Sequence, residues 1–115
     1  MPRQAKNTNL AEELIKLSAK GAADKAQARA KRVKDIADRA TRNFRDFSKD
    51  AAEDGRRGVH IAFADYYDLD HPLDPEILEG WTEAAARLVN MNIEARIEKE
   101  AKALYGTSYY LVARW

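Results

Sequence analysis

The sequence contains no cysteine, only three prolines and five glycines among its 115 residues, and no long apolar run. The absence of cysteine excludes disulfides and cysteine-ligated zinc, so packing alone must hold the fold together. No stretch reaches the roughly 18 apolar residues that a membrane span needs, and the first residues lack the apolar core of a signal peptide. We therefore expect a soluble, cytoplasmic, single-domain protein with no membrane partner.

Motifs typical of enzymes are also missing. The chain has no Gly-x-Ser-x-Gly, no phosphate-binding P-loop, no Gly-x-Gly-x-x-Gly and no His-Glu-x-x-His. Its 19 Asp and Glu residues are numerous enough for carboxylate pairs to arise by chance. We therefore predict that the protein is not an enzyme and that it has no catalytic residue, cofactor or metal.

One acidic segment resembles a metal site. Residues 65–79 place Asp68 and Asp74 near His71, with a spacing similar to that of a calcium-binding loop. The match fails because Leu73 stands where such a loop needs its turn glycine. We favour a solvated loop that caps the next helix, and keep a small metal-dependent module at this acidic loop as a third hypothesis.

The near-neutral net charge of +1 conceals two oppositely charged halves. Residues 1–58 carry 15 Lys and Arg against 9 Asp and Glu, whereas residues 59–115 carry 5 against 10. Such asymmetry is typical of chains that bind a polyanion or that contact other copies of themselves. A basic helix that is merely solvated is the alternative.

The first half of the chain is predicted to be largely helical. Residues 1–8 are polar and aperiodic, which indicates a flexible arm, and residues 9–54 form a basic helical segment. An unbroken helix of this length would extend about 70 Å, so we expect either a break near Gly21 or packing on another molecule. Its first apolar stripe comprises Leu10, Leu14, Ile15 and Leu17, and its second comprises Val33, Ile36, Ala40, Phe44, Phe47 and Ala51.

The second half, residues 55–115, is predicted to be a compact α+β part. Residues 59–67 alternate as a strand does, although a helix fits almost as well. A helix begins at Pro75, capped by Asp74, and runs to about Tyr105 before a second strand at 108–115. We therefore predict a mostly α (α+β) fold with a long N-terminal helix, a second long helix and a small two-stranded sheet. A right-handed parallel crossover between the two strands is allowed.

Function is predicted from the surfaces that these elements leave open. Two strands and two helices cannot cover all the apolar side chains, so the leading hypothesis is a small assembly protein that self-associates as a homo-oligomer or docks on a larger complex. The predicted apolar partner contacts are Leu10, Leu14, Leu17, Trp81, Leu104 and Trp115. Small cysteine-free chains with a long basic helix are frequent among phage and mobile-element proteins, which adds the virion to the expected locations.

The alternative hypothesis is a nucleic-acid-associated protein. Its basic helix over residues 20–45 and its Arg56/Arg57 pair would bind phosphates by charge, with little base specificity. Aspartates interrupt the basic run at helical spacing, which is also the pattern of an ordinary solvated helix. The residues predicted to contact nucleic acid or a partner are Lys20, Lys25, Arg29, Lys31, Arg32, Arg39, Arg42, Arg56 and Arg57.

Overall fold

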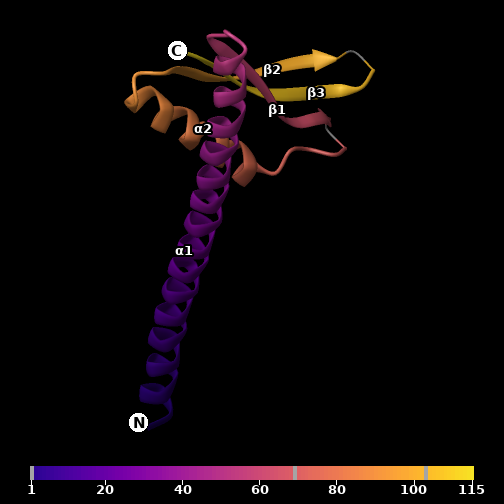
Figure 1. Ribbon diagram of the computed structural model, residues 1–115. Helices are drawn as coiled ribbons and strands as arrows, with labels where there is room; N and C mark the ends of the chain where they lie inside the picture. The colour runs from indigo at the N-terminus through magenta and orange to yellow at the C-terminus, as the bar shows by residue number, and fades with distance from the viewer. Residues whose placement is uncertain (1, 69, 103) are drawn as a thin grey trace. The chain divides into compact units, whose positions relative to one another are not determined.

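The computed structural model describes residues 2–68, 70–102 and 104–115, with side chains from residue 9 onward except that of residue 66. The chain divides into two compact units, Met1–Lys31 and Arg32–Trp115. Helix α1 (Pro2–Glu53) contributes to both units. The second unit continues with β1 (Gly58–Tyr67), α2 (Pro75–Asn90), β2 (Glu94–Lys102) and β3 (Gly106–Arg114), in the order that Figure 1 shows.

Helix α1 is continuous across Gly21, so the alternative of a break there is not found. The residues around Gly21 are rich in lysine, alanine and glutamine, which favour helix. Their helix propensity offsets the cost of one interior glycine, about 1 kcal/mol relative to alanine. The helical backbone also includes residues 2–8, where we expected an arm, because Pro2 suits a first helical position and no breaker follows it. The flexibility of that arm stays a prediction, since residue 1 and the side chains of residues 1–8 lie outside the described part of the chain.

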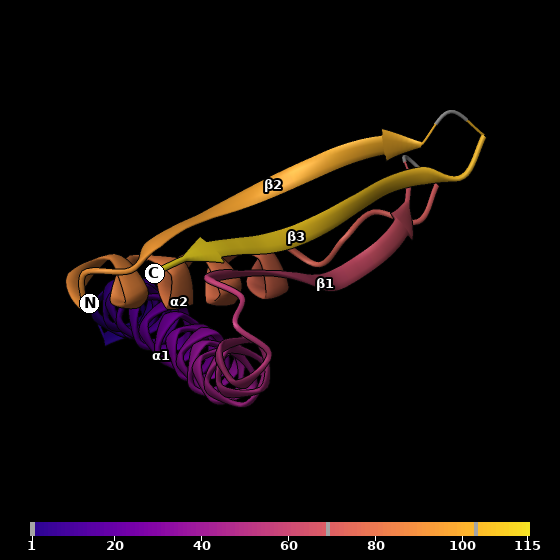
Figure 2. The same cartoon turned by 45° about the horizontal axis from the view of Figure 1, so that its top comes forward.

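The sheet has three strands, so the prediction of a two-stranded sheet is wrong. The strand order is β1-β3-β2 and both pairings are antiparallel, which also replaces the parallel crossover that we considered. Figure 2 shows β3 between its two neighbours, with α2 running along one face of the sheet. The strand predicted at 59–67 is confirmed by β1.

The additional strand is β2, and its residues were predicted to belong to the second helix. Helix α2 begins at Pro75 as predicted, with the Asp74 carboxylate accepting the Glu76 N–H at 2.9 Å, but it ends at Asn90. A turn follows in which Asn92 has a φ of 65°, a left-handed conformation that asparagine tolerates. Beyond it, apolar and charged side chains alternate with the period of a strand.

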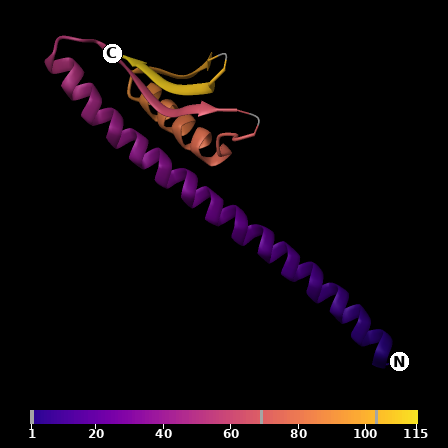
Figure 3. The same ribbon diagram turned by 90° about the vertical axis from the view of Figure 1, so that its right-hand side faces the viewer.

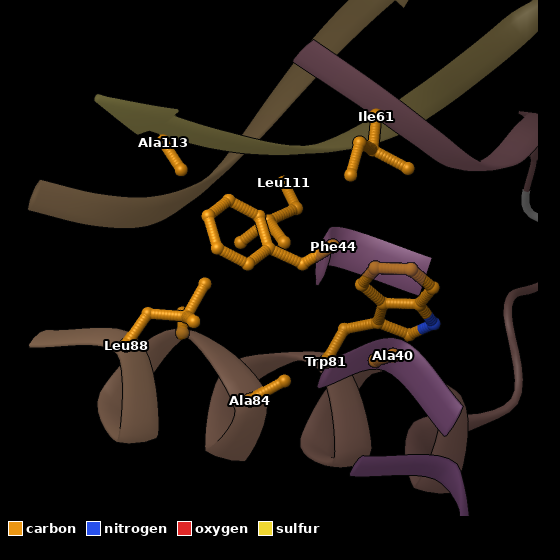
Figure 4. Close-up of a cluster of buried hydrophobic side chains, with 9 residues drawn as sticks. Ala40, Phe44, Ile61, Trp81, Ala84, Leu88, Leu111 and Ala113 are labelled. Carbon is orange, nitrogen blue, oxygen red and sulfur yellow. The ribbon is translucent and has the colours of Figure 1, made fainter. Parts of the chain in front are cut away.

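The core of the second unit lies between the sheet and the two helices. Phe44 of α1, Leu88 of α2 and Leu111 of β3 are buried and point toward one another (Figure 4). Trp81 joins them from α2 and stacks on Phe63 of β1, with ring centroids 4.6 Å apart. Helix α2 covers one face of the sheet, and among the described residues of the second unit Figure 3 shows no helix over the opposite face.

Ion pairs fasten the C-terminal part of α1 to α2. The Arg87 guanidinium donates to Asp38 at 2.7 Å and to Glu83 at 3.2 Å. The hydrogen bond from Arg87 lowers the pKa of the Asp38 carboxyl. The Arg32 guanidinium donates to both carboxylate oxygens of Glu76, at 2.8 and 2.7 Å, and this bond raises the pKa of Arg32. Among the residues that the structure describes, no helix is both long and apolar enough to cross a membrane.

Candidate functional site

The first unit presents an apolar stripe that nothing within that unit covers. All of its described residues belong to α1, and from residue 9 to residue 31 every side chain except that of Arg29 is exposed. Leu10, Leu14 and Leu17 lie on one side of the helix because they are spaced by four and three residues. Their exposed fractions are 53%, 53% and 63%. A single helix has no second element against which to bury them.

Gly21 continues the same face, four residues after Leu17. A Cβ added to Gly21 would meet no atom within 4 Å, and the glycine has no positive φ. Nothing in the described part of the chain therefore requires a glycine, although glycine costs about 1 kcal/mol relative to alanine in a helix interior. We name the face formed by Leu10, Leu14, Leu17 and Gly21 the leucine seam.

Charged side chains flank the leucine seam. Glu13 and Lys20 are seven residues apart and therefore lie on the same flank, two helical turns from each other. Lys25 lies on the opposite flank, one turn beyond Gly21. The apolar seam ends at Asp24, which occupies the position that the next leucine would take. The face therefore has an apolar centre, a mixed-charge border and a defined length.

The other predicted apolar contacts do not form one surface. Trp81 is only 8% exposed and belongs to the core, because the apolar face of α2 packs against the sheet rather than against a partner. Trp115 packs against the same core, in an edge-to-face contact with Phe44 at 6.2 Å. Leu104 is 91% exposed at the turn between β2 and β3. Only the leucines of the first unit remain together as an exposed group.

The predicted basic contacts are also dispersed. Arg32 is occupied by Glu76, and the Arg57 guanidinium donates to the Trp115 carbonyl at 3.1 Å. Arg39 and Arg42 lie on the part of α1 where Asp35 and Asp38 alternate with them. The exposed basic residues of the first unit include Lys20, Lys25 and Lys31, and Arg56 lies in the loop before β1. A helix with this mixed pattern is ordinarily solvated.

A basic cleft on the uncovered face of the sheet was not predicted from the sequence. It has a volume of about 420 Å³, and its lining includes Arg57, His60, Arg96 and Arg114 together with Glu94. Pairing with β3 sets His60 and Arg96 on either side of Val112. The signal in the sequence was the alternation of Glu94, Arg96 and Glu98 with apolar residues, which a helix assignment obscured.

The acidic segment 65–79 shows no convergence of ligands among its described residues. The Asp68 carboxylate accepts the backbone N–H groups of Asp70 and His71, at 2.9 and 2.7 Å. The His71 N–H is the main reason that the pKa of Asp68 is lowered. In the part of the chain that the structure describes, no group of three or more histidines and acids is placed to hold a metal ion.

Comparison with known proteins adds no relative: no protein-family model, curated protein or solved structure matches this chain.

Proposed function

We propose that this chain is a non-enzymatic assembly protein that works through protein–protein contacts, with the leucine seam as its contact surface. The observation that carries the proposal is a helical unit that exposes more than half of each of Leu10, Leu14 and Leu17. Burying a fully exposed leucine side chain is worth about 1.5–3 kcal/mol, and slightly more than half of each of these three remains to be covered. A partner that covers all three therefore gains roughly 2–5 kcal/mol. A helix without tertiary packing is itself only marginally stable in water, so a partner that covers these leucines also orders the helix, and the cost of that ordering is subtracted from the gain.

The distribution of charge supports association between copies. Residues 9–31 carry five Lys and Arg against three Asp and Glu, whereas residues 32–115 carry 13 against 16. Opposite charges on different parts of the chain raise the rate at which copies encounter one another, whereas the leucine seam supplies the contact itself. Self-association is therefore the first form of the proposal, and docking on a larger complex is the second.

Sedimentation velocity of the full chain and of two matched variants tests the proposal. Leu14→Asp places a charge in the leucine seam, and Leu104→Asp places the same charge on an exposed leucine of the second unit. We expect the wild type and Leu104→Asp to associate and Leu14→Asp to sediment as a monomer. Loss of association in both variants, or in neither, contradicts a role for the seam.

A second candidate function is phosphate binding, as in a nucleic-acid-associated protein. The observation that favours it is the basic cleft, in which three arginines and His60 line one recess. Guanidinium groups bind phosphate oxygens through paired, charge-assisted hydrogen bonds. Fluorescence anisotropy with single-stranded and duplex DNA at two salt concentrations tests this function. Salt-sensitive binding that Arg114→Ala weakens and Arg45→Ala preserves would support the cleft as the site, because Arg45 is an exposed arginine of α1 outside the cleft. No binding at low salt excludes this function.

A further inference from the structure

We propose that the leucine seam pairs with the leucine seam of a second copy in antiparallel orientation. Leu14 of one copy then packs on Leu17 of the other, and Leu10 packs over Gly21. This inference rests on the proposed function and adds to it the identity of the partner and the arrangement of the two helices.

The spacing of the seam is that of a helix pair. Positions 10, 14, 17 and 21 follow one another by four, three and four residues, the alternation that keeps one face toward a partner helix. The polar Asp24 ends this alternation after two heptads. The contact is therefore short, and its register is set by four positions on each copy.

Gly21 favours the antiparallel register. When the four seam positions of one copy are aligned in reverse order with those of a second copy, Leu10 faces Gly21 and Leu14 faces Leu17. The bulky Leu10 then enters the open space above Gly21, where an added Cβ would meet no atom of the chain within 4 Å. A parallel, in-register pair would set Gly21 against Gly21 and leave a gap between the helices, with the loss of contacts that a gap entails.

The flanking charges favour the same orientation. In an antiparallel pair, residues on the same flank of the seam face each other, so Glu13 of each copy faces Lys20 of the other. The arrangement forms two opposite-charge contacts. In a parallel pair, residues on opposite flanks meet, and Lys20 of one copy would face Lys25 of the other. Like charges repel, which disfavours the parallel pair.

The same segment supplies both sides of every contact, which is the reason to name a second copy as the partner. A two-fold interface requires that if one residue contacts another, the reverse contact also exists. The leucine seam meets this requirement for both its apolar and its charged contacts. The β2 edge of the sheet is a less suitable interface, because this edge strand carries Glu94, Arg96, Glu98, Lys99, Glu100 and Lys102, and charges on an edge strand oppose pairing.

Charge reversal tests the orientation. We expect Glu13→Lys and Lys20→Glu each to weaken self-association about tenfold in sedimentation equilibrium, because each turns two attractive contacts into repulsive ones. The double variant, which exchanges the charges, should recover wild-type affinity. Lys16→Glu is the matched control: it makes the same change in net charge as Lys20→Glu but away from the seam, and it should leave affinity within about twofold after allowance for screening.

The outcomes separate this inference from the proposed function. A parallel pair predicts that Lys20→Glu strengthens association, because the new carboxylate would face Lys25 of the partner. A wild-type oligomer whose affinity neither reversal changes would overturn the antiparallel pairing and leave the assembly function standing. A wild-type chain that stays monomeric would overturn both. Circular dichroism of each variant confirms that helix content is unchanged, since these side chains are exposed.

A distance measurement gives an independent check. The chain has no cysteine, so Ala26→Cys introduces a single attachment site for a spin label on the side of the helix away from the seam. In the antiparallel register the two labels are separated by about 30 Å along the helix axis, at 1.5 Å per residue. In a parallel pair they lie at the same level, within roughly 10 Å plus the label lengths. The short distance would contradict the proposal.

Discussion

Adding one methyl group at Gly80 tests how closely α2 packs against the C-terminal part of α1. A Cβ at this position would lie 2.3 Å from Ile36 Cγ2, 2.6 Å from Ile36 Cβ and 3.2 Å from the Val33 carbonyl oxygen. Carbon atoms in ordinary contact are about 3.5–4 Å apart, so the two helices must separate by roughly 1 Å or more. The Ile36 Cβ is fixed to the backbone and its branched side chain is stiff, so a rotamer change cannot remove the clash.

The magnitude follows from two opposing terms. Overpacking costs about 1–3 kcal/mol, and the upper end applies here because a Cβ atom is involved. Replacing glycine by alanine in a helix returns about 1 kcal/mol. We therefore expect Gly80→Ala to lower the free energy of unfolding by about 2 kcal/mol, with a fall in Tm of roughly 10 °C.

Urea unfolding followed by tryptophan fluorescence measures this change, because Trp81 and Trp115 both pack in or against the core of the second unit. Gly21→Ala is the matched control: a Cβ there meets no atom of the chain within 4 Å, so the substitution keeps only the gain in helix propensity and should not destabilise the protein. In the Gly80→Ala background, Ile36→Ala should cost less than it does in the wild type. A Gly80→Ala variant as stable as the wild type would refute the close packing of the two helices.

Two further predictions concern the same unit. Phe63→Leu removes the stack on Trp81 and should cost about 1 kcal/mol in urea unfolding beyond the lost area, whereas Phe47→Leu, at a side chain that is 55% exposed, should cost little. Asp38→Asn removes a carboxylate whose pKa the Arg87 hydrogen bond lowers. The contribution of Asp38 is present above its unfolded-state pKa of about 3.9 and is lost as pH falls through its lower folded-state pKa. The variant should therefore be less stable at neutral pH and show a flatter decline in acid, and an unchanged decline would contradict the pairing.

The sequence was sufficient wherever a local signal acted alone. Asp74 and Pro75 mark the start of α2 because a capping carboxylate and a fixed φ determine a helix N-terminus without tertiary context. Gly55, with a φ of 82°, follows the end of α1 in the left-handed conformation that glycine favours after a last helical turn. Both features are decided by the backbone of a few neighbouring residues.

Strand β2 was not predicted because its apolar residues fit both the helical and the strand periodicity. Ile93, Ile97 and Ala101 are spaced by four residues, which fits a helix face and equally fits one side of a strand. The residue that breaks the helix before this segment is Asn92, and asparagine also occurs within helices, so it gives no clear signal of a helix end. Pairing with β3 makes this segment a strand. A local sequence pattern does not show a pairing partner that lies farther along the chain.

The candidate functional site also includes features that the sequence predicted and features that it did not. The exposure of Leu10, Leu14 and Leu17 was predictable, since the stretch after them offers no apolar side chain larger than alanine to build a core. The burial of Trp81 was not, because an apolar helix face has the same pattern whether the sheet or another molecule covers it. The basic cleft required the strand register that places His60 and Arg96 on either side of Val112.

The native mass of the unmodified chain over a range of concentrations tests the central claim most directly. One copy has a mass of 13.0 kDa. Sedimentation equilibrium from nanomolar to high micromolar concentration should show the mass rising to twice this value, with a midpoint that Leu14→Asp moves to higher concentration. A mass of one copy throughout that range would contradict the claim that the leucine seam joins two copies of this protein.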